Sequence, residues 1–461
     1  MNTQIFRAYD IRGVADRDLT NEVAFAIGWA YATMVAAHRG KAPSATTICL
    51  GRDCRLSSDR LYTNFLGGVR AVGVAVVDIG VVATPELYWS VFARAADGGV
   101  QITGSHNPAD QNGFKMMLGQ GTLHGDKIEA LRDLIACDVA TWMAAFRAPH
   151  DLRATPWPEL RAAYVADIAA RLRIGARMPK VVLDAGSGAG GPAGQALLEM
   201  LGVPHIALYT AMDGRFPHHH PDPTVEANLV DLIRTVRAER ADIGIAFAGD
   251  ADRIGVVDHT GKLLWGDRLL VVLARDVLSR NPGAAVVGEV KCSKTLFAEI
   301  AKAGGRPIMS AVGHSIIKDR MKKEGALLAG EMSGHIFYAE RWYGFDDAIH
   351  VMARLIEILS HTGASLAELL ADVPETEVTP EIRLDCSDDK KFAIVAEAVA
   401  HYQAAHPVVD IDGARIDFGH GWGLIRASNT QPVIVLRAEA ETAAGLAQIR
   451  AELEAFVAAR G

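Results

Sequence analysis

A single pattern recurs along most of this chain: a short run of β-branched residues, a glycine or polar turn, and then an apolar-periodic helix. Strands that alternate with helices of about 10–15 residues are typical of βαβ units. We therefore expect an α/β fold with mixed, mostly parallel sheets. The expected strands are 46–51, 74–80, 99–103, 180–184, 243–248, 284–290 and 307–311, and the expected helices lie near 59–72, 86–94, 192–201, 228–239 and 294–303.

Three stretches without apolar periodicity interrupt this pattern, at 148–160, 258–262 and 371–383. Each of the first three segments carries a βαβ pattern that ends in a polar loop, which suggests a repeated structural unit. After the third stretch, strand-dense sequence is closed by helices, as in a small α+β domain. The chain of 461 residues is thus expected to form four domains, at 1–150, 151–257, 258–368 and 369–461.

The charge balance is acidic, with 47 Lys and Arg against 55 Asp and Glu and a formal net charge of −8. This argues against a protein that coats nucleic acid or an anionic membrane, although a local basic cleft could still bind a small phosphorylated molecule. Five scattered cysteines without a CxxC pair favour free thiols in a reducing compartment. The start has no signal-peptide pattern, and the apolar stretch 23–37 is too short to span a bilayer. We expect a cytoplasmic protein.

The first candidate site is the loop TGSHNP (103–108), which follows the strand at 99–103. A glycine-flanked serine at a strand end is exposed, and neighbouring backbone N–H groups can receive an anion. Because a serine hydroxyl is a weak nucleophile, Ser105 would need a base, a metal or prior phosphorylation. Taken alone, such a loop is more often an ordinary turn.

The second candidate is AGDADR (248–253), at the end of the strand 243–248. Asp250 and Asp252, at alternate positions, can converge on a hard cation such as Mg²⁺, which prefers oxygen ligands. Arg253 adds a fixed positive charge for a phosphate. A polar β-turn is the alternative.

Two further loops carry polar side chains suited to a phosphosugar. In GEMSGH (330–335), Glu331, Ser333 and His335 alternate, so in an extended loop they face one way and could hold two neighbouring sugar hydroxyls. In RASNTQP (426–432), an arginine and small polar donors resemble an anion nest for a phosphate. An ordinary polar loop is the alternative for each.

Two other motifs admit a different function. GSGAGG (186–191) fits the G-x-G-x-x-G dinucleotide fingerprint, with Asp213 about 22 residues on. A nucleotide-dependent dehydrogenase is therefore one alternative, and a tight strand-to-helix turn is the other. His218–His220 could bind a metal, but consecutive residues do not face one way, and the flanking prolines favour a rigid connector.

Together and in this order, the motifs resemble those of the α-D-phosphohexomutase superfamily, and specifically its bacterial phosphomannomutase/phosphoglucomutase branch. The resemblance covers essentially the whole chain and implies three related α/β domains and a smaller α+β C-terminal domain around a central cleft. It also implies that the glycine-rich segment GSGAGG (186–191) is a structural turn between a strand and a helix. The other segments that carry the resemblance are FRAYDIRG (6–13), NGFK (112–115), FPHHHPDP (216–223), VGHSIIK (312–318) and ERWYGFDDA (340–348).

The resemblance implies an isomerase that interconverts hexose 1-phosphate and hexose 6-phosphate, of mannose and glucose, through a phosphoserine and a hexose 1,6-bisphosphate intermediate. The implied cofactors are one Mg²⁺ per chain and glucose 1,6-bisphosphate as activator. The implied partner is a small phosphosugar, with no nucleic acid or membrane. The chain would be a monomer or a weak homo-oligomer.

The resemblance also implies a role for individual residues. Ser105 matches the phosphorylated serine and, with Asp250 and Asp252, the metal ligands. The positions near the reacting phosphoryl group are Arg12, His106, Lys115, Arg253 and Lys291, of which His106 and Lys115 are the candidates for acid–base work. The substrate contacts are Tyr9, His314, Glu331, Ser333 and His335, together with Arg426, Ser428, Asn429 and Thr430 for the non-transferred phosphate.

One position departs from the family pattern Asp-Gly-Asp-x-Asp-Arg, because Ala248 stands where the first aspartate is expected. Losing a carboxylate removes an oxygen ligand and a negative charge, so Mg²⁺ should bind more weakly. We therefore expect the chain to be impaired and Ala248→Asp to raise its turnover. The alternative is a catalytically weak sugar-phosphate-binding protein that retains the cleft.

Overall fold

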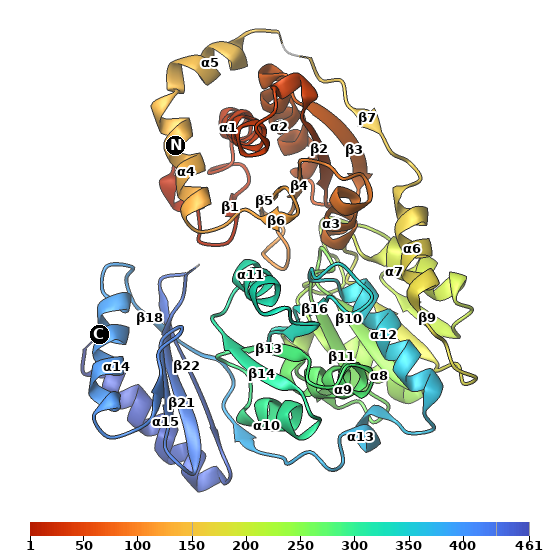
Figure 1. The fold of residues 1–461 in the computed structure, drawn as a ribbon, viewed down its shortest axis with the longest axis vertical. Coiled ribbons are helices and arrows are strands. Elements are labelled where there is room, and N and C mark those ends of the chain that lie inside the picture. The colour runs from red at the N-terminus through yellow and green to blue at the C-terminus, as the bar shows by residue number, and fades with distance from the viewer. Residues whose placement is uncertain (150, 430, 461) are drawn as a thin grey trace.

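Four separate β-sheets organise the chain, and each takes nearly all of its strands from one stretch of sequence (Figure 1). The computed structural model describes residues 1–149, 151–429 and 431–460. Three sheets are mixed, and the fourth is antiparallel in all its described pairs. Within the described ranges, no helix combines the length and the apolar character needed to cross a bilayer.

The first domain contains the strand that delivers the TGSHNP loop. Its elements are β1 (Ile11–Val14), α1 (Asn21–Arg39), β2 (Thr47–Arg52), α2 (Ser58–Val72), β3 (Ala75–Val81), α3 (Thr84–Ala93), β4 (Gly98–Ile102), β5 (Gln111–Leu118), β6 (Gly121–Thr122), α4 (Asp126–Cys137), α5 (Val139–Arg147) and β7 (Thr155–Pro156). The sheet order is β1-β5-β4-β2-β3-β7, with β6 beside β5. Because β7 lies beyond residue 150, this sheet extends past the expected first boundary.

Helices α1 and α2 of this domain pack at very short range. A Cβ on Gly28 would lie 2.2 Å from the carbonyl oxygen of Phe65, and a Cβ on Gly68 would lie 2.1 Å from that of Phe25. Glycine alone allows two helix backbones to approach this closely. Gly28, which lies within the apolar stretch 23–37, is therefore a helix-packing residue.

The second domain delivers the AGDADR loop. Its elements are α6 (Leu160–Arg171), β8 (Val181–Asp184), α7 (Gly191–Met200), β9 (His205–Leu208), α8 (Val230–Glu239), β10 (Ile243–Phe247), β11 (Ile254–Asp258) and β12 (Leu263–Leu264). The sheet order is β12-β11-β10-β8-β9. The stretch 258–262, expected as a joint, is the turn of the β11–β12 hairpin, so the expected boundary at 257/258 falls inside this sheet.

The third and fourth domains differ in class. The third contains α9 (Gly266–Arg280), β13 (Ala285–Glu289), α10 (Lys294–Lys302), β14 (Arg306–Ser310), α11 (His314–Glu324), β15 (Leu328–Gly330), β16 (Ile336–Tyr338), α12 (Ala348–His361) and α13 (Leu366–Leu369), with sheet order β14-β13-β15-β16. The fourth contains β17 (Glu377–Val378), β18 (Ile382–Asp385), α14 (Lys391–Gln403), β19 (Val408–Val409), β20 (Ala414–Asp417), β21 (Gly421–Ala427), β22 (Val433–Ala440) and α15 (Ala443–Ala458). It confirms the expected smaller α+β domain.

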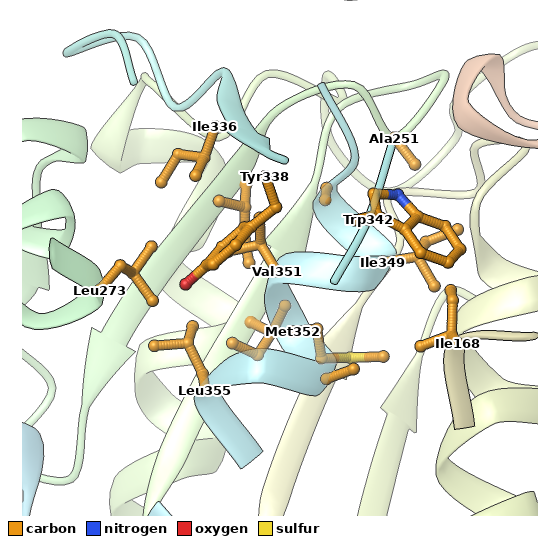
Figure 2. Close-up of a cluster of buried hydrophobic side chains, with 14 of the residues drawn as sticks. Ile168, Ala251, Leu273, Ile336, Tyr338, Trp342, Ile349, Val351, Met352 and Leu355 are labelled. Atoms are coloured by element: carbon orange, nitrogen blue, oxygen red, sulfur yellow. The ribbon is translucent and has the colours of Figure 1, made fainter. Parts of the chain in front are cut away.

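Helix α12 joins the second and third domains through a shared hydrophobic core. Figure 2 shows its side chain Ile349 in one cluster with Ile168 of α6 and Leu273 of α9. Burying a side chain of this size contributes about 1.5–3 kcal/mol. Ala251 of the AGDADR loop belongs to the same cluster, and its carbonyl accepts a hydrogen bond from Ala348 N at 3.1 Å. The loop is thus fixed on a buried helix.

Candidate active site

A cavity of about 920 Å³ lies where the four domains meet, and residues of every domain line it. It brings together almost all the predicted site residues: Tyr9, Arg12, Ser105, His106, Lys115, Asp252, Arg253, Lys291, His314, Glu331, Ser333, His335, Arg426, Ser428 and Asn429. Asp250 and Ala248 are completely buried beside Asp252 in the same loop. Thr430 lies outside the described residues.

The TGSHNP loop follows β4 and turns back on itself. Thr103 Oγ1 accepts a hydrogen bond from Ser105 N at 2.9 Å, and Asn107 N donates to Gly104 O at 2.9 Å. Ser105 has a φ of +52°, in the left-handed region that is uncommon for a residue with a side chain. Strain of this kind persists where the surroundings over-determine the backbone, and it clusters at functional sites.

Arg55 holds this loop from behind, although no motif pointed to it. Its side chain is completely buried, and Nε donates to Asp53 Oδ2 at 3.2 Å. A Cβ on Gly104 would lie 2.5 Å from the guanidinium, which explains the glycine of the motif. The guanidinium donates to four backbone carbonyl oxygens, those of Ser105 at 2.8 Å, Asn107 at 2.7 Å, Pro108 at 2.6 Å and Gln111 at 3.0 Å.

Replacing Arg55 with lysine is expected to lower the free energy of unfolding by about 2–4 kcal/mol and to slow turnover. Lysine keeps the charge, but an ammonium cannot reach four carbonyls, and each buried carbonyl without a donor costs about 1–3 kcal/mol. Denaturant unfolding measures the loss. Arg17→Lys is the control, because the Arg17 side chain is 74% exposed. Equal stability of the Arg55→Lys and unsubstituted chains would contradict this role.

His106 faces the serine as a neutral base. Its Nδ1 lies 3.3 Å from Ser105 Oγ. Burial, together with the charges of Arg253 and Arg12, holds the pKa of His106 well below its ordinary value. The imidazole therefore stays uncharged at neutral pH and can accept a proton. Arg12 also donates to Thr103 O at 2.8 Å and so packs against the same loop.

The AGDADR loop meets Ser105 from the second domain. Asp252 Oδ1 lies 3.5 Å from Ser105 Oγ. Lys115 Nζ, from β5, bridges the two aspartates: it donates to Asp250 Oδ2 at 2.8 Å and to Asp252 Oδ2. Asp250 Oδ2 also accepts from Thr84 Oγ1 at 2.5 Å. Burial alone would raise the pKa of Asp252, but the positive groups around it, of which Lys115 is the strongest, together outweigh burial and lower that pKa, so the carboxylate stays charged.

The oxygen donors at this junction suit a magnesium ion. Ser105, Asp250 and Asp252 offer hard oxygens, and Asp250 Oδ1 is buried without a hydrogen-bond partner among the described residues. Mg²⁺ is commonly held by one or two carboxylates together with phosphate oxygens and waters. Ala248 adds no donor, and Lys115 already places one positive charge between the two carboxylates. These residues therefore fit the ion, with one ligand fewer than the family pattern and with Lys115 as a competitor.

A second group could also hold a metal ion: Asp252, His335 and Asp346 place ligand atoms within 4.8 Å of one another. Arg253 Nε lies 2.9 Å from His335 Nε2. Because a guanidinium only donates, the ring proton of His335 belongs on Nδ1, which faces Asp346 Oδ2 at 3.1 Å. Arg253 thus occupies one ring nitrogen of His335, whereas Nδ1 and Asp346 Oδ2, although close, form no hydrogen bond among the described residues.

The GEMSGH loop is a tight turn, not the extended loop expected from its alternating pattern, because Gly334 N donates to Glu331 O at 3.1 Å. Two of its polar side chains still meet at the cavity wall. Ser333 Oγ donates to Glu331 Oε2 at 3.1 Å, and Glu331 Oε1 accepts from Gly313 N at 2.7 Å. His314 lines the same cavity, and its buried Nε2 has no hydrogen-bond partner in the described part of the chain. Together they suit neighbouring sugar hydroxyls.

The RASNTQP loop reaches from β21 across to the first and third domains. Arg426 Nε donates to Asp412 Oδ2 at 2.8 Å. Asn429 Nδ2 donates to Tyr9 OH at 2.8 Å, and that hydroxyl donates to Val312 O at 2.8 Å. Hydrogen bonds therefore join three domains on this side of the cavity.

Lys391 supports the same loop, and the sequence patterns did not reveal it. Its side chain is 4% exposed, and Nζ donates to the carbonyl oxygens of Ser428 at 2.5 Å and Gln431 at 3.0 Å. It also pairs with Asp388 at 2.5 Å. The buried ammonium therefore holds two backbone carbonyls of the loop, while Asp388 offsets its charge.

Lys291 lies elsewhere than expected. Its Nζ pairs with Glu381 Oε2 of the fourth domain at 3.2 Å. The charges that act on it most strongly are those of Glu289, Glu381, Glu331 and Arg426. It thus belongs with the sugar and phosphate loops and not, as expected, with the reacting phosphoryl group at Ser105.

Protein atoms occupy the space beside the glycine-rich turn 186–191. Ala189 N donates to Gly249 O at 2.8 Å, and a Cβ on Gly188 would lie 2.5 Å from that same oxygen. A Cβ on Gly190 would lie 2.4 Å from the Cβ of Ala251. A bound pyrophosphate would need these N–H groups and this space. The turn is a structural corner that carries the AGDADR loop, which disfavours the dehydrogenase alternative.

Four family models match the chain in order. They are described as phosphoglucomutase/phosphomannomutase alpha/beta/alpha domain I, domain II, domain III and the C-terminal domain, and they match residues 3–137, 162–261, 265–376 and 381–456.

Individual relatives are similar along nearly their whole length. The phosphomannomutase/phosphoglucomutase of Pseudomonas aeruginosa is 45% identical over 448 residues, which cover 97% of this chain and 94% of the relative. The phosphoglucomutase of Neisseria meningitidis is 42% identical, covering 98% and 96%. The crystal structure of a phosphoglucomutase/phosphomannomutase family protein from Burkholderia thailandensis superimposes with a TM-score of 0.88 at 40% identity, covering 100% of this chain and 98% of that one. This chain belongs to the phosphoglucomutase/phosphomannomutase family.

Proposed function

We propose that this chain interconverts hexose 1-phosphate and hexose 6-phosphate, with glucose and mannose as its sugars. The observation that carries the proposal is one cavity whose lining combines Ser105 and Arg253, from the first and second domains, with Arg426 from the fourth. A sugar bisphosphate would use both sets of residues at once. The name of the Pseudomonas aeruginosa relative, phosphomannomutase/phosphoglucomutase, supports both sugars.

In the proposed reaction, Ser105 carries a phosphoryl group and donates it to the free hydroxyl of the sugar phosphate. The bond from Ser105 Oγ to phosphorus breaks while the bond to the sugar oxygen forms. The hydroxyl proton passes to His106 and from there to Ser105 Oγ, 3.3 Å from its Nδ1. Arg12 and Arg253 hold the phosphoryl oxygens. Ser105, Asp250 and Asp252 would hold a Mg²⁺ ion, which would neutralise charge during the transfer.

The product of this first step is a hexose 1,6-bisphosphate, which must turn end for end before the other phosphoryl group returns to Ser105. Glu331 and Ser333 would bind the 3- and 4-hydroxyls, which roughly exchange places when the sugar turns. Glucose and mannose differ only at C2, so this pair accepts both. Free glucose 1,6-bisphosphate would activate the chain by loading Ser105.

A coupled assay tests the proposal, with glucose 1-phosphate or mannose 1-phosphate as substrate and a trace of glucose 1,6-bisphosphate. We expect conversion of both sugars and one added phosphoryl group in the intact mass. Binding of the sugar phosphates without conversion would instead support a sugar-phosphate-binding protein, and tight NAD(P) binding would support the dehydrogenase.

The acidic limb of kcat/KM is expected well below pH 6.5. His106 must be neutral to accept a proton, and burial with the charges of Arg253 and Arg12 lowers its pKa from the ordinary value of 6.5. The base form is therefore lost only as pH falls through this lowered pKa, and kcat/KM reports the free enzyme. Arg253→Gln removes one of the charges and should move the limb upward. A limb that lies at or above pH 6.5 in the unsubstituted chain would contradict this role of His106.

We further propose a monomer or weak homo-oligomer in the cytoplasm, with no nucleic acid or membrane partner. The five cysteines are unpaired, in keeping with a reducing compartment. The net charge of −8 disfavours polyanionic partners.

A further inference from the structure

The histidine segment His218–His220 has no role in the proposed reaction, yet it lies where the loops of the site meet. Pro221 O, directly after the segment, accepts a hydrogen bond from Gly249 N at 3.1 Å. Gly249 in turn packs on the serine loop, since a Cβ there would lie 2.6 Å from Ser105 O. The segment therefore borders the AGDADR loop, which itself contacts the TGSHNP loop.

Two of the three histidines make directed contacts. His220 Nε2 lies 2.5 Å from the carbonyl oxygen of His106. Because a carbonyl only accepts, His220 carries its proton on Nε2 and donates it. His219 Nε2 lies 3.0 Å from Asp184 Oδ2, and His219 Nδ1 lies 3.0 Å from the carbonyl oxygen of His220. The backbone of His220 is therefore itself held in place. The two Nε2 atoms serve separate acceptors, and a shared metal site does not fit them.

The bond from His220 completes the support of the serine loop. Arg55 donates to the carbonyls of Ser105 and Asn107, at 2.8 and 2.7 Å. The carbonyl between them, that of His106, receives its hydrogen bond from His220. Three consecutive carbonyls thus each have a donor, two from within the first domain and one from the second.

We propose that His220 is a positioning residue for phosphoryl transfer: from the second domain it fixes the His106 peptide, and with it the direction in which His106 Nδ1 faces Ser105 Oγ. The inference rests on the proposed function. Ser105 holds a left-handed φ of +52° that needs such constraint. Misplacing a reacting group by about 1 Å can cost on the order of 100-fold in rate.

The test compares His220→Ala, His220→Gln and His220→Asn with His218→Ala. The glutamine amide reaches about as far as imidazole Nε2, whereas the asparagine amide stops short, at the place of Nδ1. His218→Ala is the matched control, because His218 is exposed and stacks on Tyr209, with ring centroids 3.9 Å apart. Three quantities are measured for each variant: the rate of loading by glucose 1,6-bisphosphate, followed as intact mass; kcat and KM; and the Tm.

For His220→Ala we expect loading and kcat to fall by about 10- to 100-fold, with KM within about twofold and His218→Ala unchanged. His220→Gln should recover most of the rate, and His220→Asn should not. If His220→Ala fails to fold, the comparison of the rates of His220→Gln and His220→Asn tests the inference by itself. Loading and kcat within twofold of the unsubstituted chain in His220→Ala, or equal rates for Gln and Asn, would overturn the inference. An unsubstituted chain that never loads would overturn the proposed function first, which keeps the two failures distinct.

Discussion

Replacing Ser105 with alanine is expected to abolish turnover, lowering kcat by about 10⁴-fold or more, because the proposed reaction passes its phosphoryl group through this one oxygen. The neighbouring groups have other roles in the proposed reaction. His106 is a base at 3.3 Å, Asp252 is a carboxylate at 3.5 Å, and Lys115 is already bound to both aspartates. All three are arranged around Ser105 Oγ, so removing it leaves them without the atom on which they act.

Intact mass after incubation with glucose 1,6-bisphosphate checks this result separately from turnover. The unsubstituted chain should gain one phosphoryl group and Ser105→Ala should gain none. Ser279→Ala is the matched control, because Ser279 is exposed near the end of α9 and its hydroxyl donates to the nearby carbonyl of Asp276 at 2.7 Å. A phosphoryl group that remains on the Ser105→Ala chain would show that another residue carries it.

The places of the main loops could be predicted from the sequence because the strands before them are clear. TGSHNP follows β4 and AGDADR follows β10, and both strands are completely buried. A buried strand gives way to polar residues where it ends, so a polar motif there marks the edge of the sheet at which ligand-binding loops gather. The same signal was present in DCR (53–55), directly after β2, and it would have indicated Arg55.

The remaining features depend on contacts between distant segments. Lys391 and His220 both donate to backbone carbonyls of loops, and a carbonyl has no sequence signature. Lys291 follows a strand as expected, yet its position is set by Glu381 of the next domain. The turn at 258–262 has the composition of a linker, but β12 returns to pair with β11, and only the pairing distinguishes a hairpin from a joint.

Restoring an aspartate at position 248 is the change expected to raise activity most. Ala248 is completely buried, and its backbone already makes the turn: Ala248 N donates to Arg253 O at 3.1 Å and Ala251 N donates to Ala248 O at 2.8 Å. These backbone hydrogen bonds do not depend on the side chain at position 248. Asp250 Oδ1 is a buried oxygen that lacks a hydrogen-bond partner among the described residues.

The charges explain why one carboxylate matters so much. The two aspartates of the loop are already balanced by two cations, Arg253 of the loop itself and Lys115 Nζ, and any divalent ion must compete with Lys115. A third carboxylate leaves the loop with a net charge of about −1 even with Lys115 in place, which favours a divalent ion. We expect Ala248→Asp to bind Mg²⁺ about 10- to 100-fold more tightly and to raise kcat at saturating Mg²⁺ by on the order of 100-fold.

Two measurements separate this effect from a change in packing. Titration calorimetry with Mg²⁺ measures the affinity directly. The Tm measured with and without Mg²⁺ shows the cost of the buried charge. Without the ion the Tm of Ala248→Asp should be below that of the unsubstituted chain, and Mg²⁺ should raise it by more. Ala248→Asn has the same shape without the charge, and it should improve neither Mg²⁺ affinity nor kcat to a comparable extent. If Ala248→Asp and the unsubstituted chain bind Mg²⁺ equally and turn over at equal rates, the missing carboxylate is not what limits this chain. Lys115 would then supply the positive charge that the loop needs.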